Sequence, residues 1–317
     1  MEQVEERYIS LLTDFGFKRI FGSAPNKDLL ICFLNSLFNG KQVVKDVSYL
    51  NPEHVGDVYT DRRAIFDVYC EGENGEKFIV EMQNAYQTYF KDRSLFYSTF
   101  PIREQAPKGD DWDFKLNHVY TVALLNFSMN DDAFDKEKIR HHVQLCDTAT
   151  HKVFYDKLEF IYVEIAKFDK KLDELQTLYE KWLYALKNLY KLSQRPKELC
   201  DKVFDRLFEE AEIAKFSPLE MREYEASKKA YRDIKNSVDT AKREGIAEGM
   251  KQGMKQGMKQ GMEKGMKQGI EKGMKQGLEQ RSLEIARKML AKGMDAASVM
   301  EITGLSAEQM RQLKAEF

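Results

Sequence analysis

The stretch RAIFDVYCEGENGEKFIVEMQN, residues 63–84, decides the fold, because it predicts two β-strands joined by a tight turn. A three-residue loop over residues 73–75, with Gly75 supplying a positive φ, is a common way to close such a hairpin. Counting outward from this loop along both strands places Asp67 directly opposite Glu81.

A two-residue loop over residues 74–75 is the alternative, and it would place apolar residues opposite polar ones on both faces. With the three-residue loop, one face is wholly apolar and gathers Ala64, Phe66, Val68, Cys70, Phe78, Val80 and Met82. The opposite face gathers Ile65, Asp67, Tyr69, Ile79, Glu81 and Gln83. The hairpin therefore brings two carboxylates within about 5 Å of each other, and the Gln83 amide follows on the same side.

Two facing carboxylates repel each other, so the predicted pair needs a neutralising partner. A hard divalent cation fits best, and Mg²⁺ or Mn²⁺ accepts oxygen ligands from two carboxylates with waters in the remaining positions. Such an ion lowers the pKa of a bound water and stabilises charge on a phosphoryl group. The pattern alone leaves a second interpretation open, in which Asp67 and Glu81 face solvent on a half-exposed hairpin.

Further elements are predicted on both sides of the hairpin. Helices are predicted in the first stretch, where Leu11, Leu12, Phe15 and Ile20 share a face, and over residues 28–38 and 89–99. Strands are predicted over residues 43–50, 63–71, 77–84, 118–127 and 160–166. From residue 170 to about 243 the apolar spacing predicts helix throughout. This order of elements indicates an α/β domain followed by a helical annex.

Four blocks of sequence resemble the Rpn family of recombination-promoting nucleases, which are PD-(D/E)XK transposases. In order they are TDFGFKRIFG (13–22), FDVYCEGENGEKFIVEMQ (66–83), KDRSLFYS (91–98) and LEFIYVEIAKF (158–168). The acidic residue at the end of one strand and Glu-x-Gln on the next resemble the nuclease signature. The glycine-rich tail and the ending ITGLSAEQM are also similar to the family's C-terminal region, so the resemblance covers nearly the whole chain.

The resemblance implies a restriction-endonuclease-like mixed sheet flanked by helices, and a metal-dependent DNA endonuclease that promotes recombination. It also implies that Asp67 and Glu81 hold the metal, with Asp14 as an accessory acid near it. Gln83 stands where the superfamily more often has lysine. Phe66 replaces the superfamily's proline, which is not a ligand.

The amide at position 83 can orient a water, but it cannot offer positive charge to a phosphorane as an ammonium does. Two basic side chains are candidates to supply that charge. Lys18 lies one helical turn after Asp14, and Arg93 lies one turn before Tyr97 on the helix after the hairpin. For each of them an ordinary solvated helix face is the alternative.

Residues 244–281 form a tetrapeptide repeat, mostly Gly-Met-Lys-Gln, with nine glycines from Gly245 to Gly277. A period of four drifts by about 40° per repeat on an α-helix, so the glycines spiral round its axis. Nine glycines cost roughly 8–9 kcal/mol relative to alanine, and we expect a frayed helix at best. The repeat is interpreted as a flexible charged spacer, or as a stalk that self-associates or contacts DNA.

The last segment, residues 282–317, predicts three short helices separated by turns at Gly293 and Gly304. Ser306 with Gln309 predicts a capping box at the start of the last helix, and the turn before it resembles a helix-turn-helix. That last helix is electrically neutral, whereas contact with phosphates favours positive charge. We therefore favour a small assembly module over a DNA-reading one.

The charge and cysteine content restrict the class of protein. Residues 241–281 carry ten Lys/Arg and five Glu, a net of +5, which leaves −7 elsewhere and argues against a broad DNA footprint outside the tail. Four scattered cysteines argue for free thiols in a reducing compartment: Cys32, Cys70, Cys146 and Cys200. The acidic N-terminus and the lack of an apolar run near 20 residues predict a soluble, cytoplasmic protein.

Together these patterns predict a nuclease-like core (1–170), a helical annex (171–243), a repeat stalk (244–281) and a helical module (282–317). The predicted activity is hydrolysis of DNA with Mg²⁺ or Mn²⁺, by a homo-oligomer assembled through the tail. One alternative is a catalytically weak relative that binds DNA or a protein, and another is an assembly protein whose stalk is the functional part. The sequence contains no phosphate-loop or GxSxG motif, and adjacent His141 and His142 point apart, which argues against nucleotide chemistry, serine hydrolysis and a histidine metal site.

Overall fold

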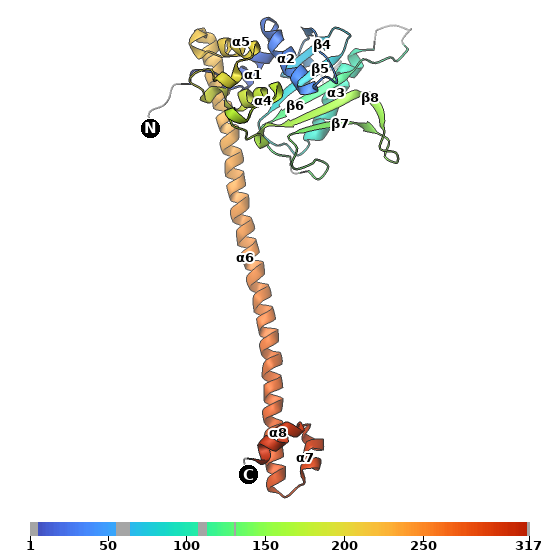
Figure 1. Cartoon of the computed structure of the whole chain (residues 1–317), viewed down its shortest axis with the longest axis vertical. Coiled ribbons are helices and arrows are strands. Elements are labelled where there is room, and N and C mark those ends of the chain that lie inside the picture. The colour runs from blue at the N-terminus through green and yellow to red at the C-terminus, as the bar shows by residue number, and fades with distance from the viewer. Residues whose placement is uncertain (1–5, 55–63, 107–112, 130, 316–317) are drawn as a thin grey trace. The chain divides into compact units, whose positions relative to one another are not determined.

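The computed structural model describes residues 6–54, 64–106, 113–129 and 131–315, and the statements below concern these residues. The strands are β1 (Val47–Tyr49), β2 (Glu53–His54), β3 (Ala64–Ile65), β4 (Val68–Gly72), β5 (Lys77–Gln83), β6 (Val119–Leu125), β7 (Arg140–Cys146) and β8 (Val153–Glu164). Six of them form a mixed sheet in the order β1-β4-β5-β6-β8-β7, and β2 pairs with β3 separately (Figure 1). This sheet, flanked by helices, confirms the predicted α/β fold.

The α-helices are α1 (Asp14–Phe21), α2 (Lys27–Phe38), α3 (Phe90–Glu104), α4 (Leu178–Asn188), α5 (Lys202–Glu210), α6 (Pro218–Ala291), α7 (Ala296–Thr303) and α8 (Ala307–Lys314). Short 3-10 turns lie between them at Ala24–Asn26, Ile165–Lys167, Leu172–Glu174, Leu189–Lys191, Lys197–Leu199 and Ile213–Lys215. The region after residue 170 was predicted to be helical throughout, which is wrong. Residues 189–201 hold only 3-10 turns and loops, because Pro196 cannot continue a helix.

The predicted register of the hairpin is confirmed. β4 and β5 are antiparallel, and Val68 lies opposite Val80, which puts Asp67 opposite Glu81 when the count continues by one residue. The loop closes with a hydrogen bond from the Gly75 amide to the Gly72 carbonyl (3.1 Å), and Gly75 has a φ of +81°. A side chain at position 75 would be strained in this conformation, so the glycine fixes the loop length and thereby the register.

Both faces of the hairpin are buried, so the interpretation of a half-exposed hairpin is wrong. One face packs into the main core with α1, α2, α4 and α5, and it contributes Val68, Cys70, Phe78, Val80 and Met82. The other face lies under α3, where Tyr69 and Ile79 contact Tyr97 and Phe100. Glu81 and Gln83 are therefore buried between the sheet and α3.

Phe66 was predicted on the apolar face with Val68, and this is wrong. It packs instead with Tyr69 and Ile79 on the α3 side. The chain bends at Asp67 between β3 and β4, and the Phe66 amide donates to the Pro52 carbonyl (3.0 Å). The bend interrupts the two-residue alternation of side chains on which the prediction depended.

The sheet is parallel through its centre, where β5 pairs with β6 and β6 with β8. Gln83, Leu125 and Glu164 lie side by side at the carboxyl ends of these three strands. Ligands of α/β proteins bind beyond this edge of a parallel sheet. The hairpin therefore delivers Glu81 and Gln83 to the edge where a binding site is expected.

Two strands, β2 and β7, were not predicted, and β8 is longer than predicted. β7 lies at the edge of the sheet, and Val143 and Leu145 within it are exposed. The first half of β8 pairs only with β7, and Phe154 there is 80% exposed. An edge hairpin exposed on both faces lacks the apolar alternation by which strands are recognised in a sequence.

The chain divides into two compact units, Met1–Asp239 and Thr240–Phe317, and the helix α6 crosses the boundary between them. α6 is one uninterrupted helix, drawn in orange in Figure 1, so the prediction of a frayed repeat is wrong. Its first turns are anchored in the first unit by the fully buried Tyr224, and its last turns hold the buried Ala286. Nucleation is the costly step of helix formation, and the two anchored ends supply it, so the helix propagates through the glycines.

The second unit ends in a small helical cluster. Ala286, Val299, Leu305, Met310 and Leu313 form its core. The predicted capping box is confirmed, because the Gln309 amide donates to Ser306 Oγ (3.3 Å) and the Ser306 amide donates to Gln309 Oε1 (2.9 Å). Gly304 ends α7 with a φ of +68°. Within the described residues no helix combines the length and apolar character needed to cross a membrane.

Candidate active site

Six residues that the sequence singled out lie together, although they come from four segments of the chain. Asp14 and Lys18 belong to α1, Asp67 lies at the bend before β4, Glu81 and Gln83 end β5, and Arg93 lies in the first turns of α3. Two sets of hydrogen bonds and ion pairs make up the network: one joins Asp14, Lys18 and Asp67, and the other joins Gln83 and Arg93 to Glu81. The charge of Asp67, which raises the pKa of Glu81, couples the two sets.

Glu81 is at the centre of this network and is 5% exposed. Its Oε2 atom accepts hydrogen bonds from Gln83 Nε2 (2.9 Å) and from an Arg93 guanidinium nitrogen (3.2 Å). Its Oε1 atom is buried and has no hydrogen-bond partner among the described residues. A buried carboxylate oxygen without a partner is costly, so this atom calls for a ligand.

The two carboxylate oxygens of Asp67 differ in their contacts. Its Oδ2 atom accepts a hydrogen bond from the Met82 amide (2.9 Å), which holds the bend against β5. Its Oδ1 atom lies 3.8 Å from Lys18 Nζ, and the same ammonium lies 2.7 Å from Asp14 Oδ1. Lys18 thus links the accessory acid predicted at position 14 to the carboxylate pair.

The electrostatics of the site follow from burial. Burial, and then the nearby charge of Asp67, raise the pKa of Glu81 to about 7, while Arg93 and Gln83 oppose the rise. Burial likewise raises the pKa of Asp67 against the lowering effect of the Met82 amide. Burial lowers the pKa of Lys18, but the hydrogen bond to Asp14 and the surrounding carboxylates outweigh it, so the pKa is raised. The Lys18 ammonium therefore stays charged, but the positive charges nearby do not fully offset the burial of Asp67 and Glu81, whose pKa values are raised.

The residues present fit a hard divalent cation. Asp67 Oδ1 lies 3.8 Å from the Lys18 ammonium, beyond hydrogen-bond distance, and Glu81 Oε1 has no hydrogen-bond partner among the described residues, so each carboxylate keeps an oxygen for a ligand. No group of three or more His, Cys, Asp or Glu side chains is placed to hold a metal in the described part of the chain. The two carboxylates alone suit Mg²⁺, which commonly binds one or two carboxylates and keeps several waters.

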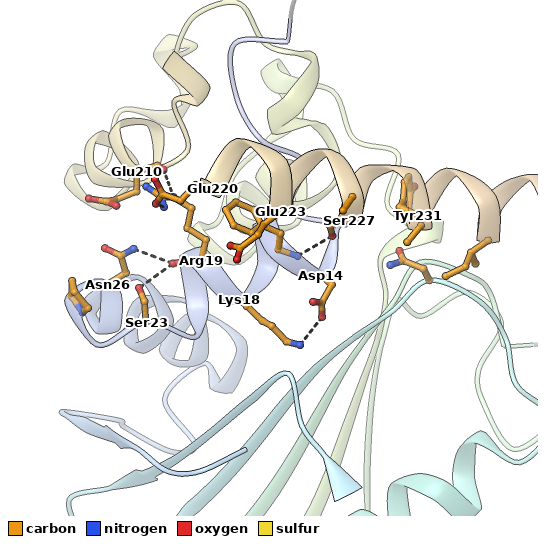
Figure 2. A pocket seen from close by; sticks show the side chains of 16 residues that line it. Asp14, Lys18, Arg19, Ser23, Asn26, Glu210, Glu220, Glu223, Ser227 and Tyr231 are labelled. Carbon is orange, nitrogen blue, oxygen red and sulfur yellow. Dashed lines mark hydrogen bonds and ion pairs between the residues drawn. The ribbon is translucent and has the colours of Figure 1, made fainter. Parts of the chain in front are cut away.

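A cavity of about 920 Å³ adjoins the site between α1 and the first turns of α6 (Figure 2). It shares Asp14 and Lys18 with the site and reaches Asn84, the residue after Gln83. Its charged lining consists of four carboxylates and two basic side chains, namely Asp14, Glu210, Glu220, Glu223, Lys18 and Arg19. Both basic groups are occupied, Lys18 by Asp14 and Arg19 by Glu220, so this flank is acidic.

The loop between β5 and α3 contains residues that the sequence did not single out. Asn84 donates to the Leu12 carbonyl (2.7 Å) and accepts from Asn126 (3.2 Å), which ties this loop to the segment before α1 and to the residue that follows β6. Tyr86 and Tyr89 in the same loop are exposed. The sequence signal that could have identified this loop is the presence of two aromatic residues in a polar segment directly after the Glu-x-Gln block.

His141 and His142 point apart, as predicted. His141 lies 2.8 Å from Glu164 in the core, and its ring packs against Phe134. His142 contacts Glu159 in a separate cavity with Tyr120, on the face of the sheet that α2 covers. The two imidazoles therefore share no ligand.

Comparisons with known proteins give two family matches. A family model described as the PD-(D/E)XK nuclease family transposase matches residues 11–241. A second model, the C-terminal HTH domain of the Rpn/YhgA-like nuclease family, matches residues 279–315. Searches of curated proteins and of solved structures found no match. The first match covers well over half of the chain and includes all six site residues. The second match favours a DNA-binding role for the last segment, where the neutral last helix had suggested an assembly module.

Proposed function

Because the chain belongs to the PD-(D/E)XK nuclease family of transposases, we propose that it is a metal-dependent endonuclease that hydrolyses phosphodiester bonds of DNA and promotes recombination. The observation that carries the proposal is the facing pair Asp67 and Glu81, which the hairpin register brings together. Lys18 and Arg93 lie beside this pair, at 3.8 Å and 3.2 Å from its carboxylate oxygens.

Each residue has a role in this proposal. Asp67 and Glu81 would hold Mg²⁺ or Mn²⁺, and such an ion acidifies water and stabilises charge on a phosphoryl oxygen. Arg93 and Gln83 fix the Glu81 carboxylate through its Oε2 atom and leave Oε1 free. Lys18 supplies a positive charge beside Asp67, where a phosphate oxygen would carry its negative charge. Asp14 holds that ammonium in place.

Supercoiled plasmid tests the proposal directly. Purified full-length protein is incubated with plasmid in Mg²⁺, in Mn²⁺ and in EDTA, and the nicked and linear forms are separated on a gel. We expect conversion with either metal and none in EDTA. Equal conversion in EDTA would rule out a metal-dependent reaction, and no conversion under any condition would favour the second candidate below.

Gln83→Lys is expected to keep or raise the nicking rate. An ammonium at this position can stabilise charge developing on the phosphate, while the Gln83 amide that it replaces can only orient Glu81 or a water. The initial nicking rate of the variant is compared with that of the wild type at saturating Mg²⁺. A loss as large as that caused by replacing Glu81 would show that the amide has a specific role in the reaction.

The second candidate is a catalytically weak relative that binds DNA or a protein through the same surface. Two observations favour it, namely the amide at position 83 and the absence of a third acidic ligand in the described part of the chain. Such a protein binds its partner equally in Mg²⁺ and in EDTA. A binding titration under both conditions therefore separates the two candidates.

We further propose that residues 244–317 bind DNA and assemble the chain into a homo-oligomer, beyond the core and annex of residues 1–243. The match to a helix-turn-helix domain supports DNA contact, and the net charge of +5 over residues 241–281 supports nonspecific phosphate binding. Met250, Met254, Met258, Met262 and Met266 on α6 are each at least 65% exposed, which suits a helix that packs against another copy.

Deleting residues 244–317 is expected to lower both the mass and the affinity for duplex DNA, while the remaining chain stays folded. The nuclease unit has its own core, so the deletion removes few of its contacts. Light scattering gives the mass, and a salt titration of duplex binding gives the slope of log K against log salt. An unchanged mass together with an unchanged slope would contradict the proposal.

A further inference from the structure

The loop formed by residues 84–89 lies directly beside the proposed site. Arg93 proves this proximity, because one guanidinium nitrogen donates to Gln87 Oε1 (3.0 Å) and another donates to Glu81 Oε2 (3.2 Å). A single planar group thus joins the loop to the central carboxylate. The loop also leaves the carboxyl end of β5, the edge of the sheet at which ligands bind.

Two tyrosines of this loop present their rings to solvent. Tyr86 is 57% exposed and Tyr89 is 74% exposed. The Tyr86 ring packs edge-on against Phe127 at a centroid distance of 5.7 Å, and Phe127 in turn contacts Phe90 (6.2 Å), so Tyr86 is held in place. The Tyr89 carbonyl accepts from the Arg93 amide (2.9 Å), which fixes its backbone at the start of α3.

The flank of the site formed by α1 and the first turns of α6 disfavours DNA. There the cavity between α1 and α6 is lined by Asp14, Glu220 and Glu223, and its basic groups are occupied by carboxylates (Figure 2). Phosphates are repelled by such a surface, particularly at low salt. A DNA strand that reaches Asp67 and Glu81 beside Lys18 is therefore directed away from this acidic cavity and over the loop with the two tyrosines.

We propose that Tyr86 and Tyr89 form a stacking platform for unpaired bases next to the scissile phosphate, so that the substrate class is single-stranded DNA or duplex with an unpaired stretch. The proposal rests on the proposed function for the identity of its ligand as DNA. Bases within a duplex are stacked on each other and offer no free ring face, whereas unpaired bases stack on aromatic side chains. Tyrosine has few rotatable bonds, so it loses little entropy in that contact.

Binding of the full-length protein to two labelled DNAs tests the platform. The probes are an oligothymidine of about 20 nucleotides and a duplex of similar length, because a single-strand site spans about 4–16 nucleotides. Fluorescence anisotropy is measured in EDTA, so that no strand is cut. Tyr86→Ala and Tyr89→Ala are each expected to raise the Kd for oligothymidine at least about 5-fold and to change the duplex Kd less than about 2-fold, because one stacked base contributes about 1–3 kcal/mol.

Matched variants separate stacking from other effects. Tyr86→Phe and Tyr89→Phe keep the ring and are expected to bind oligothymidine as the wild type does. Phe154→Ala removes a ring that is 80% exposed, more than either tyrosine, at the far end of β8, and is expected to change neither Kd. Loss of binding in the phenylalanine variants, equal losses for both DNAs, or no loss in the alanine variants would overturn the platform.

The outcome is independent of the cutting reaction. If the protein binds oligothymidine with the expected dependence on the two tyrosines but cuts no plasmid, the platform is supported and the endonuclease proposal is wrong. If the protein cuts plasmid and both alanine variants bind oligothymidine as tightly as the wild type, only the platform proposal is wrong.

Discussion

Asp67→Asn and Glu81→Gln are each expected to lower the rate of Mg²⁺-dependent plasmid nicking by about 100-fold or more. Loss of a residue that merely supports a metal ligand already costs roughly 10–100-fold, and these two carboxylates are proposed as the ligands themselves. Both changes keep the size of the side chain and replace a charged oxygen by an amide. Initial rates are measured over a range of Mg²⁺ concentrations, so that a loss of metal affinity is distinguished from a loss of rate.

Glu73→Gln is the matched control for these variants. Glu73 lies in the exposed loop of the same hairpin, and the change removes the same charge at a position remote from the carboxylate pair. It is expected to nick at the wild-type rate. If the Asp67 and Glu81 variants also nick at that rate, the assignment of the site is wrong.

The second large effect is on stability, since Glu81→Gln is expected to stabilise the metal-free protein at pH 8 and not at pH 5. Glu81 has a pKa of about 7 in the folded protein, above its ordinary value of 4.5, because burial and Asp67 disfavour the charged form. Between these two values the folded protein holds a proton that the unfolded chain releases. Stability of the wild type therefore falls as the pH rises through this window, and it levels off above pH 7.

The size of this effect follows from the same two pKa values. Their difference corresponds to a gain of about 3 kcal/mol in the free energy of unfolding at pH 8. This is an upper bound, because Arg93 and Gln83 lose a charged partner in the variant. Urea unfolding in EDTA at pH 5 and pH 8 measures it, with Glu73→Gln as the control. If the wild type and Glu81→Gln lose the same free energy of unfolding between pH 5 and pH 8, the raised pKa does not belong to Glu81.

The sequence was sufficient to predict the hairpin, because two independent constraints agree there. A glycine suited to positive φ fixes the loop, and the alternation of Val68, Cys70, Phe78 and Val80 fixes the face, so Asp67 and Glu81 follow without knowledge of the rest of the fold. The helical spacing that singled out Lys18 and Arg93 is local as well, although their proximity to the carboxylates depends on how α1 and α3 pack.

Features set by nonlocal contacts were not predicted. Phe66 changes face because of a hydrogen bond to Pro52 and a bend, neither of which has a sequence signature. β7 is an edge strand whose pairing depends on β8 and not on its own composition. The helix α6 persists through its glycines because of anchors at both ends, which a propensity summed over the repeat does not include.

The contacts of the N-terminal segment determine when the proposed site can form during synthesis. The amides of Ile9, Ser10 and Phe15 donate to the Ala211 carbonyl, the Tyr224 hydroxyl and the Ser227 hydroxyl, at 3.0 Å, 3.1 Å and 3.0 Å. The helix that carries Lys18 is therefore held by residues made some two hundred positions later. A ribosome adds about 5–20 residues per second, so a nascent chain that has already made Arg93 waits roughly 7–27 s for the last of these partners. The proposed site is therefore completed only near the end of translation of the first unit, after its partners at the end of α5 and on α6 have been made.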